Sequence, residues 1–360
     1  MEDKKNIVVF TNTLLSGGAE KQALLLASAL HKTHRVLLVI YHGQKVEQKF
    51  LDIIVREHLH VVYLSGNAVA KTLAFYKLLR KYKVDIIFSY LLTTNLIGAL
   101  IGRLAGVKYR VGGIRNAQLD PKKLPIQRFI NNHLNTHTIF NNYTGLQSLK
   151  TKGFNDKNAV VISNGFELNG DVLTRADKKP INIITVGRFV QQKGYFIALE
   201  VMRALQQAGE NFNYTIIGYG ELESQIHAEI IALQLQDCVQ VVINPTNINA
   251  YYESADIYLC TSFFEGLSNT VMEALSFSLP VVASNVGDNN LLVEHGRNGF
   301  IVQDMEYKSF IEPIKLLINS SKVRNIMGHE SFKIIRDIYG MEAFEKKYLD
   351  FIQRCDMQLA

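Results

Sequence analysis

The chain has few of the residues that cross-link or interrupt a fold. Its 360 residues include 3 cysteines and 6 prolines. Cys238, Cys260 and Cys355 form no C-x-x-C pair. The sequence therefore indicates neither a disulfide framework nor a zinc site, and isolated thiols suit a reducing cytoplasm. Because 48% of the residues are hydrophobic and 20% are charged, a disordered or collagen-like chain is also excluded.

Long apolar runs are missing as well. Residues 1–5 are mostly charged and lead directly into a short apolar strand, which is not the pattern of a signal peptide. The longest apolar stretch, residues 91–107, is too short and too polar to cross a bilayer. It is interrupted by Thr93, Thr94, Asn95 and Arg103. We therefore expect a cytoplasmic protein that meets a membrane only peripherally, at its inner face.

Short β-branched runs alternate with longer helical patterns along almost the whole chain. The length predicts about two domains, and fully apolar strands separated by helices are typical of parallel sheets covered on both faces. We expect an α/β fold with two Rossmann-like, doubly wound parallel-sheet domains that face each other across a cleft, the usual ligand site of such sheets. Residues 164–182 are polar and lack periodicity, which indicates the connection. The expected parts are residues 1–166, residues 167–339, and a helix in residues 340–360 that packs back on the first domain.

The formal net charge of +6 conceals an asymmetry. Residues 1–166 hold 23 Lys and Arg against 9 Asp and Glu, a net +14, whereas residues 167–360 hold 16 against 24, a net −8. A basic half of this kind is typical of proteins that bind nucleic acid, an anionic membrane surface or a phosphorylated substrate.

Four segments combine glycine with charge directly after a predicted strand. They are 15–20 (LSGGAE), 186–194 (VGRFVQQKG), 218–221 (GYGE) and 264–274 (FEGLSNTVMEA). Glycines let a backbone approach a ligand closely, and the amides at a helix N-terminus attract an anion. Each segment alone would also fit a tight turn or solvated surface cations. The G-x-G-x-x-G dinucleotide fingerprint is absent, which weakens a dehydrogenase interpretation.

The charged residues of these segments suit a ligand with phosphates and hydroxyls. Arg188 follows a strand and Lys193 precedes a helix, and together they could grip two adjacent phosphates. Glu273 lies in an otherwise apolar helix, where a carboxylate is costly to bury unless it is paired or binds a ligand. Sugars and ribose are natural partners for it, and pairing with a neighbouring cation is the alternative.

The order of the motifs resembles the family 4 retaining glycosyltransferases of the GT-B fold. The motifs are GGAE, the pair Asn164-Gly165, VGR-x4-KG, G-x-G-E-L, Glu-x7-Glu with EGLSN, and a final G-x-x-G-F turn at Gly296. They extend over nearly the whole chain, and the Glu-x7-Glu segment with its upstream Arg-x4-Lys is the specific part. The resemblance implies a retaining hexosyltransferase of bacterial polysaccharide or lipid-linked oligosaccharide synthesis that needs no cofactor beyond its nucleotide-sugar co-substrate, with a UDP-sugar favoured.

The resemblance also implies a role for each position. Arg188 and Lys193 would neutralise the donor diphosphate, Glu265 would contact the transferred sugar, and Glu273 would hold the ribose hydroxyls. The base would lie against the 218–221 turn and the backbone near residues 243–246. Backbone groups of the glycine turns and helix starts would complete the donor site. Those residues are Gly17, Gly18, Gly218, Gly220, Glu221, Gly266, Leu267, Ser268 and Asn269.

No D-x-D sequence occurs, so the metal clamp of the other large glycosyltransferase fold has no evident ligands, and cations would take its place. The resemblance implies a front-face, oxocarbenium-like path in which the leaving phosphate draws the acceptor proton. Many members carry a histidine after the fifth strand of the first domain, where this chain has Arg115. Arg115 is a candidate contact for the donor phosphate or the acceptor. We expect His133 and His137 to be packing or surface residues.

Basic amphipathic stretches in the first half predict a membrane contact. A predicted helix combines apolar residues with Lys71, Lys77, Arg80, Lys81 and Lys83. The second stretch, residues 119–129, contains Lys122, Lys123 and Arg128. We expect the first domain to bind a lipid-linked or glycan acceptor at an anionic membrane surface, and a solvated helix face is the alternative.

Three other functions fit parts of the sequence. A nucleic-acid platform is disfavoured, because a recognition motif is missing and the second half is acidic. A nucleotide-sugar epimerase of the same fold would act on the donor with no acceptor present. The third is a membrane-binding or ligand-binding protein without catalysis. Replacing Glu265 or Arg188 with Ala should reduce catalysis strongly, and unchanged turnover would contradict the assignment of the site.

Overall fold

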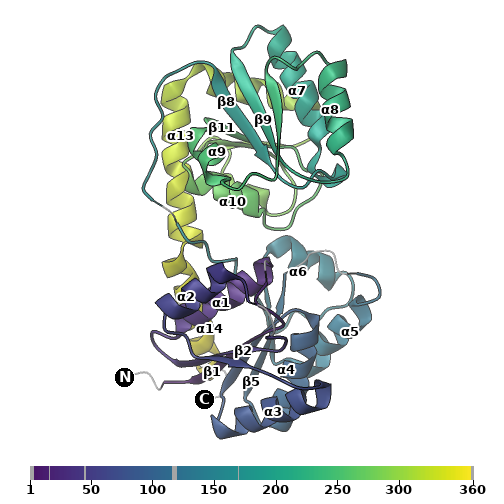
Figure 1. The fold of residues 1–360 in the computed structure, drawn as a ribbon, viewed down its shortest axis with the longest axis vertical. Coiled ribbons are helices and arrows are strands. Elements are labelled where there is room, and N and C mark those ends of the chain that lie inside the picture. The colour runs from purple at the N-terminus through teal and green to yellow at the C-terminus, as the bar shows by residue number, and fades with distance from the viewer. Residues whose placement is uncertain (1–3, 16, 44–45, 116–119, 169, 358–360) are drawn as a thin grey trace. The chain divides into compact units, whose positions relative to one another are not determined.

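The computed structural model describes residues 4–15, 17–43, 46–115, 120–168 and 170–357. The chain divides into two compact units, Met1–Gly165 with Met341–Ala360, and Phe166–Gly340. Each unit has one parallel sheet with helices on both faces (Figure 1). The expected α/β class with two doubly wound parallel sheets is confirmed, and the C-terminal helix belongs to the first unit. Within the described residues, no helix combines the length and apolarity needed to cross a bilayer.

The first unit contains a seven-stranded sheet in the order β3-β2-β1-β4-β5-β6-β7. Its strands are β1 (Asn6–Thr11), β2 (Arg35–Ile40), β3 (Val61–Tyr63), β4 (Ile86–Tyr90), β5 (Tyr109–Ile114), β6 (His137–Phe140) and β7 (Ala159–Val161). Its helices are α1 (Gly18–Leu30), α2 (Gln48–Arg56), α3 (Ala68–Lys81), α4 (Leu92–Leu104), α5 (Leu124–Phe129), α6 (Tyr143–Lys150) and α14 (Met341–Met357), and a π-helical turn (Ile130–Leu134) continues α5. The strand order reverses between β1 and β4.

Alternate side chains of β1 fill the two apolar layers of this unit, as the two-residue period of a strand requires. Ile7 and Val9 pack in a layer with α1 and α14. Phe10 points to the opposite layer, where its ring stacks on Phe75 of α3 with centroids 4.4 Å apart. The apolar run of α1 extends around most of the helix, because α14 covers its outer side.

The second unit contains a six-stranded sheet in the order β10-β9-β8-β11-β12-β13. Its strands are β8 (Ile181–Val186), β9 (Phe212–Gly218), β10 (Val239–Ile243), β11 (Ile257–Cys260), β12 (Val281–Ser284) and β13 (Gly299–Val302). Its helices are α7 (Tyr195–Gln207), α8 (Glu223–Ala232), α9 (Asn249–Ser254), α10 (Asn269–Ser276), α11 (Asn289–Leu292), α12 (Tyr307–Asn319) and α13 (Ser321–Ile334). A 3-10 turn (Gln191–Lys193) precedes α7, and a π-helical turn (Ile335–Tyr339) follows α13. The order reverses between β8 and β11.

The candidate segments lie where ligands of parallel sheets usually bind. Ligands meet the carboxyl ends of the strands at the point where the strand order reverses. Segment 15–20 follows β1, segment 186–194 follows β8 and segment 264–274 follows β11, so all three flank such a point. The fourth segment, 218–221, follows β9, the neighbour of β8.

One detail of the basic stretches differs from the sequence prediction. Helix α3 ends at Lys81, and Lys83 lies beyond it with a φ of +48°, so Lys83 is not on the helix. Lys122 and Lys123 precede α5, which begins at Leu124. Ser16 of the first segment and residues 116–119 lie outside the described residues.

Candidate functional site

In the second unit, a charged pair joins the loop after β8 to the loop after β11. Lys193 Nζ lies 2.6 Å from Glu265 Oε1, and the two side chains are only 14% and 9% exposed. The Ser262 hydroxyl donates a second hydrogen bond to the same carboxylate oxygen, at 2.7 Å. Hydrogen bonds to an ionised group are stronger than neutral ones. The pair therefore holds two of the predicted site residues in one fixed arrangement.

Glycine allows the two loops to approach this closely. Gly194 has a φ of +64°, and a Cβ on it would lie 2.0 Å from the Thr261 carbonyl oxygen, so a side chain does not fit there. A Cβ on Gly187 would lie 3.2 Å from Cε of Lys193. The lysine stem therefore crosses the end of β8 directly over a glycine.

Arg188 is exposed, and the next residue, Phe189, is bonded to the turn after β9. Phe189 N donates to Tyr219 O at 2.7 Å, and Asn244 N donates to Gly218 O at 3.1 Å. These bonds bring together the end of β8, the predicted base-contacting turn with Gly220 and exposed Glu221, and the backbone after β10. The proposed contacts of the base therefore share one end of one sheet.

Glu273 points from α10 toward a buried tyrosine. The Tyr252 hydroxyl donates to Glu273 Oε2 at 2.8 Å. Burial, followed by the Glu273 charge, raises the pKa of Tyr252 well above its ordinary value, so this hydroxyl keeps its proton and remains a donor. The Tyr252 ring stacks on Phe277 with centroids 5.3 Å apart. A neutral hydroxyl thus orients the Glu273 carboxylate. The sequence left two alternatives for this carboxylate, ligand binding and pairing with a cation, and this hydrogen bond does not decide between them.

The residues before and within the first turn of α10 are those predicted to offer amides to an anion. Ser268 is the N-cap and is buried, Leu267 packs against the core, and Asn269 is exposed. Gly266 O accepts a hydrogen bond from Asp288 N at 2.9 Å. The N-terminus of a helix carries partial positive charge, and here it follows the loop of Glu265.

In the first unit, a carboxylate already covers the N-terminus of α1. The helix begins at Gly18 with Gly17 as its N-cap. Glu20 is 8% exposed, and its Oε1 accepts a hydrogen bond from the Thr13 hydroxyl at 2.9 Å. A Cβ on Gly17 would lie 1.9 Å from Glu20 Oε2. Because this carboxylate already supplies negative charge at the helix start, a phosphate at Gly17 and Gly18 would have to share that place with it.

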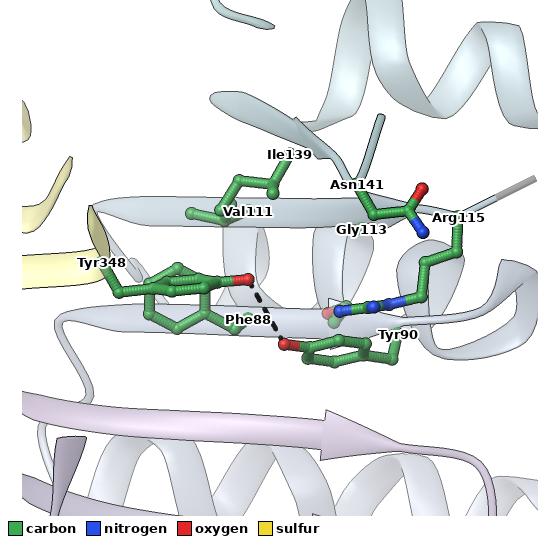
Figure 2. A pocket seen from close by; sticks show the side chains of 9 residues that line it. Phe88, Tyr90, Val111, Gly113, Arg115, Ile139, Asn141 and Tyr348 are labelled. Atoms are coloured by element: carbon green, nitrogen blue, oxygen red, sulfur yellow. Dashed lines mark hydrogen bonds between the residues drawn. The ribbon is translucent and has the colours of Figure 1, made fainter. Parts of the chain in front are cut away.

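Arg115 follows β5 in the first unit and is held by two contacts, of which Figure 2 shows the one with Tyr90. Its guanidinium lies over the Tyr90 ring, 4.6 Å from the centroid, and it donates to Asn164 Oδ1. Gln22 of α1 fixes the neighbouring Gly165 through two hydrogen bonds of 2.8 Å each. The Asn164-Gly165 motif of the sequence is therefore the element that anchors Arg115.

The structure joins Lys193 to Glu265 and places the other predicted residues of the second unit on the segments that follow β8, β9 and β11. It places Arg115, Gly17 and Gly18 in the first unit. Sequence reasoning missed the hydroxyls of Ser262 and Tyr252, and also Tyr348, whose ring lines the pocket beside Arg115. The two tyrosines lie in helical segments without a motif, where an aromatic residue is usually expected to pack in the core. His137 packs edge-on against Phe351 with centroids 5.4 Å apart, as a packing histidine should.

Metal ligands are not gathered in the described part of the chain. No group of three or more His, Cys, Asp or Glu side chains in it is arranged to hold an ion. Arg188 and Lys193 are cations in an acidic unit, since Phe166–Gly340 contains 13 Lys and Arg against 20 Asp and Glu.

Known proteins share this fold and this order of elements. A crystal structure of Anabaena Alr3699/HepE in complex with UDP superimposes with a TM-score of 0.80 over 97% of this chain and 100% of that one, at 17% identity. An uncharacterised glycosyltransferase of Haemophilus influenzae is 31% identical over 198 residues, 54% of this chain and 55% of that protein. A Campylobacter jejuni α-1,4-N-acetyl-D-galactosaminyltransferase, named for a lipid-linked acceptor ending in PP-undecaprenol, is 24% identical over 345 residues, 90% of this chain and 92% of that one. The chain spans between 33% and 62% of the length of the first three curated relatives that it matches.

The two doubly wound sheets define the fold as that of the GT-B glycosyltransferases. Residues 172–333, which lie within the second unit and contain its candidate site residues, match the family model described as glycosyl transferases group 1. The second unit is therefore similar to that family over most of its length.

Proposed function

We propose that the protein is a retaining hexosyltransferase that moves a sugar from a UDP-sugar to a lipid-linked or polysaccharide acceptor in bacterial surface-glycan synthesis. The observation that carries the proposal is the joined Lys193–Glu265 pair, with Arg188 in the loop after β8 and Glu273 on α10, the helix that follows the Glu265 loop. The UDP named in the HepE structure favours a uridine donor. The polysaccharide and lipid-linked products named for the relatives favour the acceptor class.

The residue types match the charges that the reaction develops. When the glycosidic bond to the nucleotide breaks, negative charge grows on the diphosphate and positive charge grows on the sugar ring. Lys193 and Arg188 stabilise the first, since a preorganised cation needs no rearrangement at the moment of reaction. Glu273, oriented by Tyr252, accepts hydrogen bonds from the ribose hydroxyls.

Glu265 has a positioning role toward the sugar in this proposal. Its carboxylate oxygen already accepts bonds from Lys193 and Ser262, which suits a hydrogen-bond acceptor for sugar hydroxyls better than a nucleophile. The bond from the anomeric carbon to the phosphate oxygen breaks, and a bond to the acceptor oxygen forms on the same face. The acceptor's hydroxyl proton passes to the departing UDP. No metal ion takes part in this scheme.

A surface of the first unit suits the membrane that would present a lipid-linked acceptor. We call it the α3–α4 surface, and its exposed apolar side chains are Val69, Leu73, Tyr76, Leu100 and Leu104. Val69 and Leu104 are 76% and 72% exposed, and both line one shallow groove between the helices. An apolar patch of this kind on a protein surface marks a binding face.

The charge around the α3–α4 surface points to an anionic bilayer as its partner. Between residues 68 and 110 the chain has eight cations and a single acidic residue, Asp85. The cations are Lys71, Lys77, Arg80, Lys81, Lys83, Arg103, Lys108 and Arg110. Each cation near an anionic leaflet contributes roughly 1 kcal/mol, and the apolar side chains add the energy of insertion.

The proposed activity is tested by incubating the protein with a panel of UDP- and GDP-sugars, with and without membrane lipid extract, and following UDP or GDP release. We expect UDP to bind and release to need the lipid extract. Conversion of the donor without any acceptor would identify an epimerase instead. Failure of every nucleotide diphosphate to bind would overturn the donor site.

A further inference from the structure

A small pocket lies at the carboxyl ends of β4, β5 and β6 in the first unit, with Arg115 and Tyr90 on one side and Tyr348 of α14 on another (Figure 2). Its volume is about 10 Å³, which is close to the volume that one water molecule, or one oxygen atom of a ligand, needs. No carboxylate lines it. A guanidinium in a pocket of this composition attracts an oxygen atom of an anion.

The guanidinium is held so that one of its donors remains available. Arg115 stacks on the Tyr90 ring and donates from a terminal nitrogen to Asn164 Oδ1. Asn141 Nδ2 also donates to this oxygen, at 3.5 Å, so Asn164 Oδ1 already accepts two hydrogen bonds. The Arg115 Nε is buried and has no hydrogen-bond acceptor among the described residues. A buried N–H without a partner is costly.

Two hydroxyls add to this surplus of donors. The hydroxyl oxygens of Tyr90 and Tyr348 lie 3.5 Å apart, so one hydrogen can point to the other oxygen and the second cannot. Burial raises the pKa of Tyr348 well above its ordinary value, and Tyr348 therefore stays protonated. Among the described residues, the Arg115 Nε–H has no acceptor, and the bond between the two tyrosines uses only one of their two hydroxyl hydrogens. An ionised carboxylate or phosphate is acceptor-only and supplies what is missing.

We propose that this pocket is a subsite for an anionic group of the acceptor substrate, a phosphate or a carboxylate, and that Arg115 binds it. This inference rests on the proposed function, because only a glycosyl acceptor gives the group a reason to be there. Tyr348 is a positioning residue. It closes the pocket from α14 and touches Tyr90, the ring on which the guanidinium rests.

The test measures binding of two probe anions, inorganic phosphate and D-glucuronate, to the full-length protein saturated with UDP. Saturation keeps phosphate out of the donor site at Arg188 and Lys193. At constant ionic strength, each anion is titrated to 50 mM while the melting temperature is followed. We expect a rise of about 3 °C at ten times the dissociation constant in wild type and no rise in Arg115→Gln. A response to phosphate alone identifies a phosphorylated acceptor, and a response to glucuronate alone identifies an acidic sugar.

Tyr348→Phe is compared with Tyr109→Phe, a control in the same core. The Tyr109 hydroxyl donates to the Cys355 carbonyl oxygen of α14 at 2.6 Å, outside the pocket. We expect Tyr348→Phe to weaken the anion about fivefold. Tyr109→Phe should lower the starting melting temperature and leave the anion's dissociation constant at the wild-type value. If Tyr348 were only structural, both variants would behave like Tyr109→Phe.

The outcomes separate this inference from the proposed function. An equal rise in wild type and Arg115→Gln, or no rise with either anion, overturns the subsite while UDP binding still stands. Absence of UDP binding at the start of the experiment overturns the donor site instead.

Discussion

Lys193 and Glu265 form a largely buried ion pair across two loops, with 2.6 Å between ammonium and carboxylate. The pair links the end of β8 to the loop after β11, the two strands between which the strand order reverses. Removing either charge leaves the other largely buried without its partner, in a site that water reaches poorly. This costs more stability than replacing both charged residues. The same contact therefore supports both the fold and the proposed donor site.

A double-mutant cycle of Lys193→Ala and Glu265→Ala tests this coupling. We expect each single variant to lose about 1–3 kcal/mol of unfolding free energy and the double variant to lose less than the sum, with a coupling of about 1–2 kcal/mol. Urea unfolding measures both. The exposed pair Lys315–Glu312, 3.4 Å apart, serves as the control and should couple by less than about 0.5 kcal/mol. Equal couplings for the two pairs would contradict the buried character of the first.

Arg188→Ala should separate phosphate binding from base binding. Since Arg188 is exposed, its loss should leave the fold stable. We expect at least a tenfold loss of affinity for UDP, as a hydrogen bond to a charged group contributes about 1.5–3 kcal/mol, and an unchanged affinity for uridine. Calorimetric titration measures both ligands. A parallel loss for uridine would place Arg188 away from the phosphates.

Chelation should not affect donor binding. Because Arg188 and Lys193 neutralise the diphosphate in the proposed scheme, we expect the same UDP affinity and the same transfer rate with and without EDTA. Restoration of activity by added Mg²⁺ or Mn²⁺ after chelation would show that an ion bridges the diphosphate and would remove that role from Arg188 and Lys193.

Tyr252→Phe removes one hydroxyl and keeps the stacked ring. Glu273 then loses its 2.8 Å donor, and we expect a several-fold weaker affinity for UDP together with about 1 kcal/mol lower stability. Tyr258→Phe is the matched control, since its buried hydroxyl donates to Val186 O at 3.2 Å. That variant should lose stability without a comparable loss of UDP affinity. Equal losses of UDP affinity would mean that Glu273 does not depend on Tyr252 for its orientation.

Acidic substitutions of apolar residues on the α3–α4 surface should release the protein from anionic vesicles. We expect Leu73→Glu with Leu104→Glu to abolish sedimentation with vesicles containing phosphatidylglycerol, and added salt to weaken the wild-type interaction. Val55→Glu on α2 is the control, because Val55 is 70% exposed and lies outside that surface. Sedimentation of all variants to the same extent would exclude this surface as the membrane contact.

Arg175 makes the connecting segment part of the second unit. Its guanidinium donates to the carbonyl oxygens of Ser278 and Phe277, each at 2.8 Å, and also to that of Ala255. Arg175→Met keeps much of the apolar stem and leaves these buried carbonyls without a donor. We expect a loss of about 2–3 kcal/mol in urea unfolding. Arg203, which donates to the single carbonyl of Leu233, gives the control variant and should lose less.

The strands and the local motifs could be predicted from the sequence, because both depend on neighbours in the chain. Apolar runs such as Ile181–Val186 predict buried parallel strands, and a glycine before Tyr195 predicts the tight entry into α7. The bond from Tyr252 to Glu273 could not be predicted, since it joins two helices that only the folded sheet brings together. Arg175 was likewise hidden in a segment without periodicity. Lys83 was placed on a helix because a positive φ at a lysine has no sequence signal.

Helix α14 places the end of the chain in the core of the first unit. Phe344, Tyr348 and Phe351 pack with Ile7 and Leu24, and the whole of Phe166–Gly340 lies between the two parts in sequence. During synthesis, the second unit is contiguous and can fold as soon as it has emerged, whereas the first must wait with an open apolar face. The unit that is translated first is thus completed last, and the pocket of Arg115 is completed with it. On the proposed assignment of that pocket, a nascent chain cannot bind an acceptor there before the ribosome has made Tyr348.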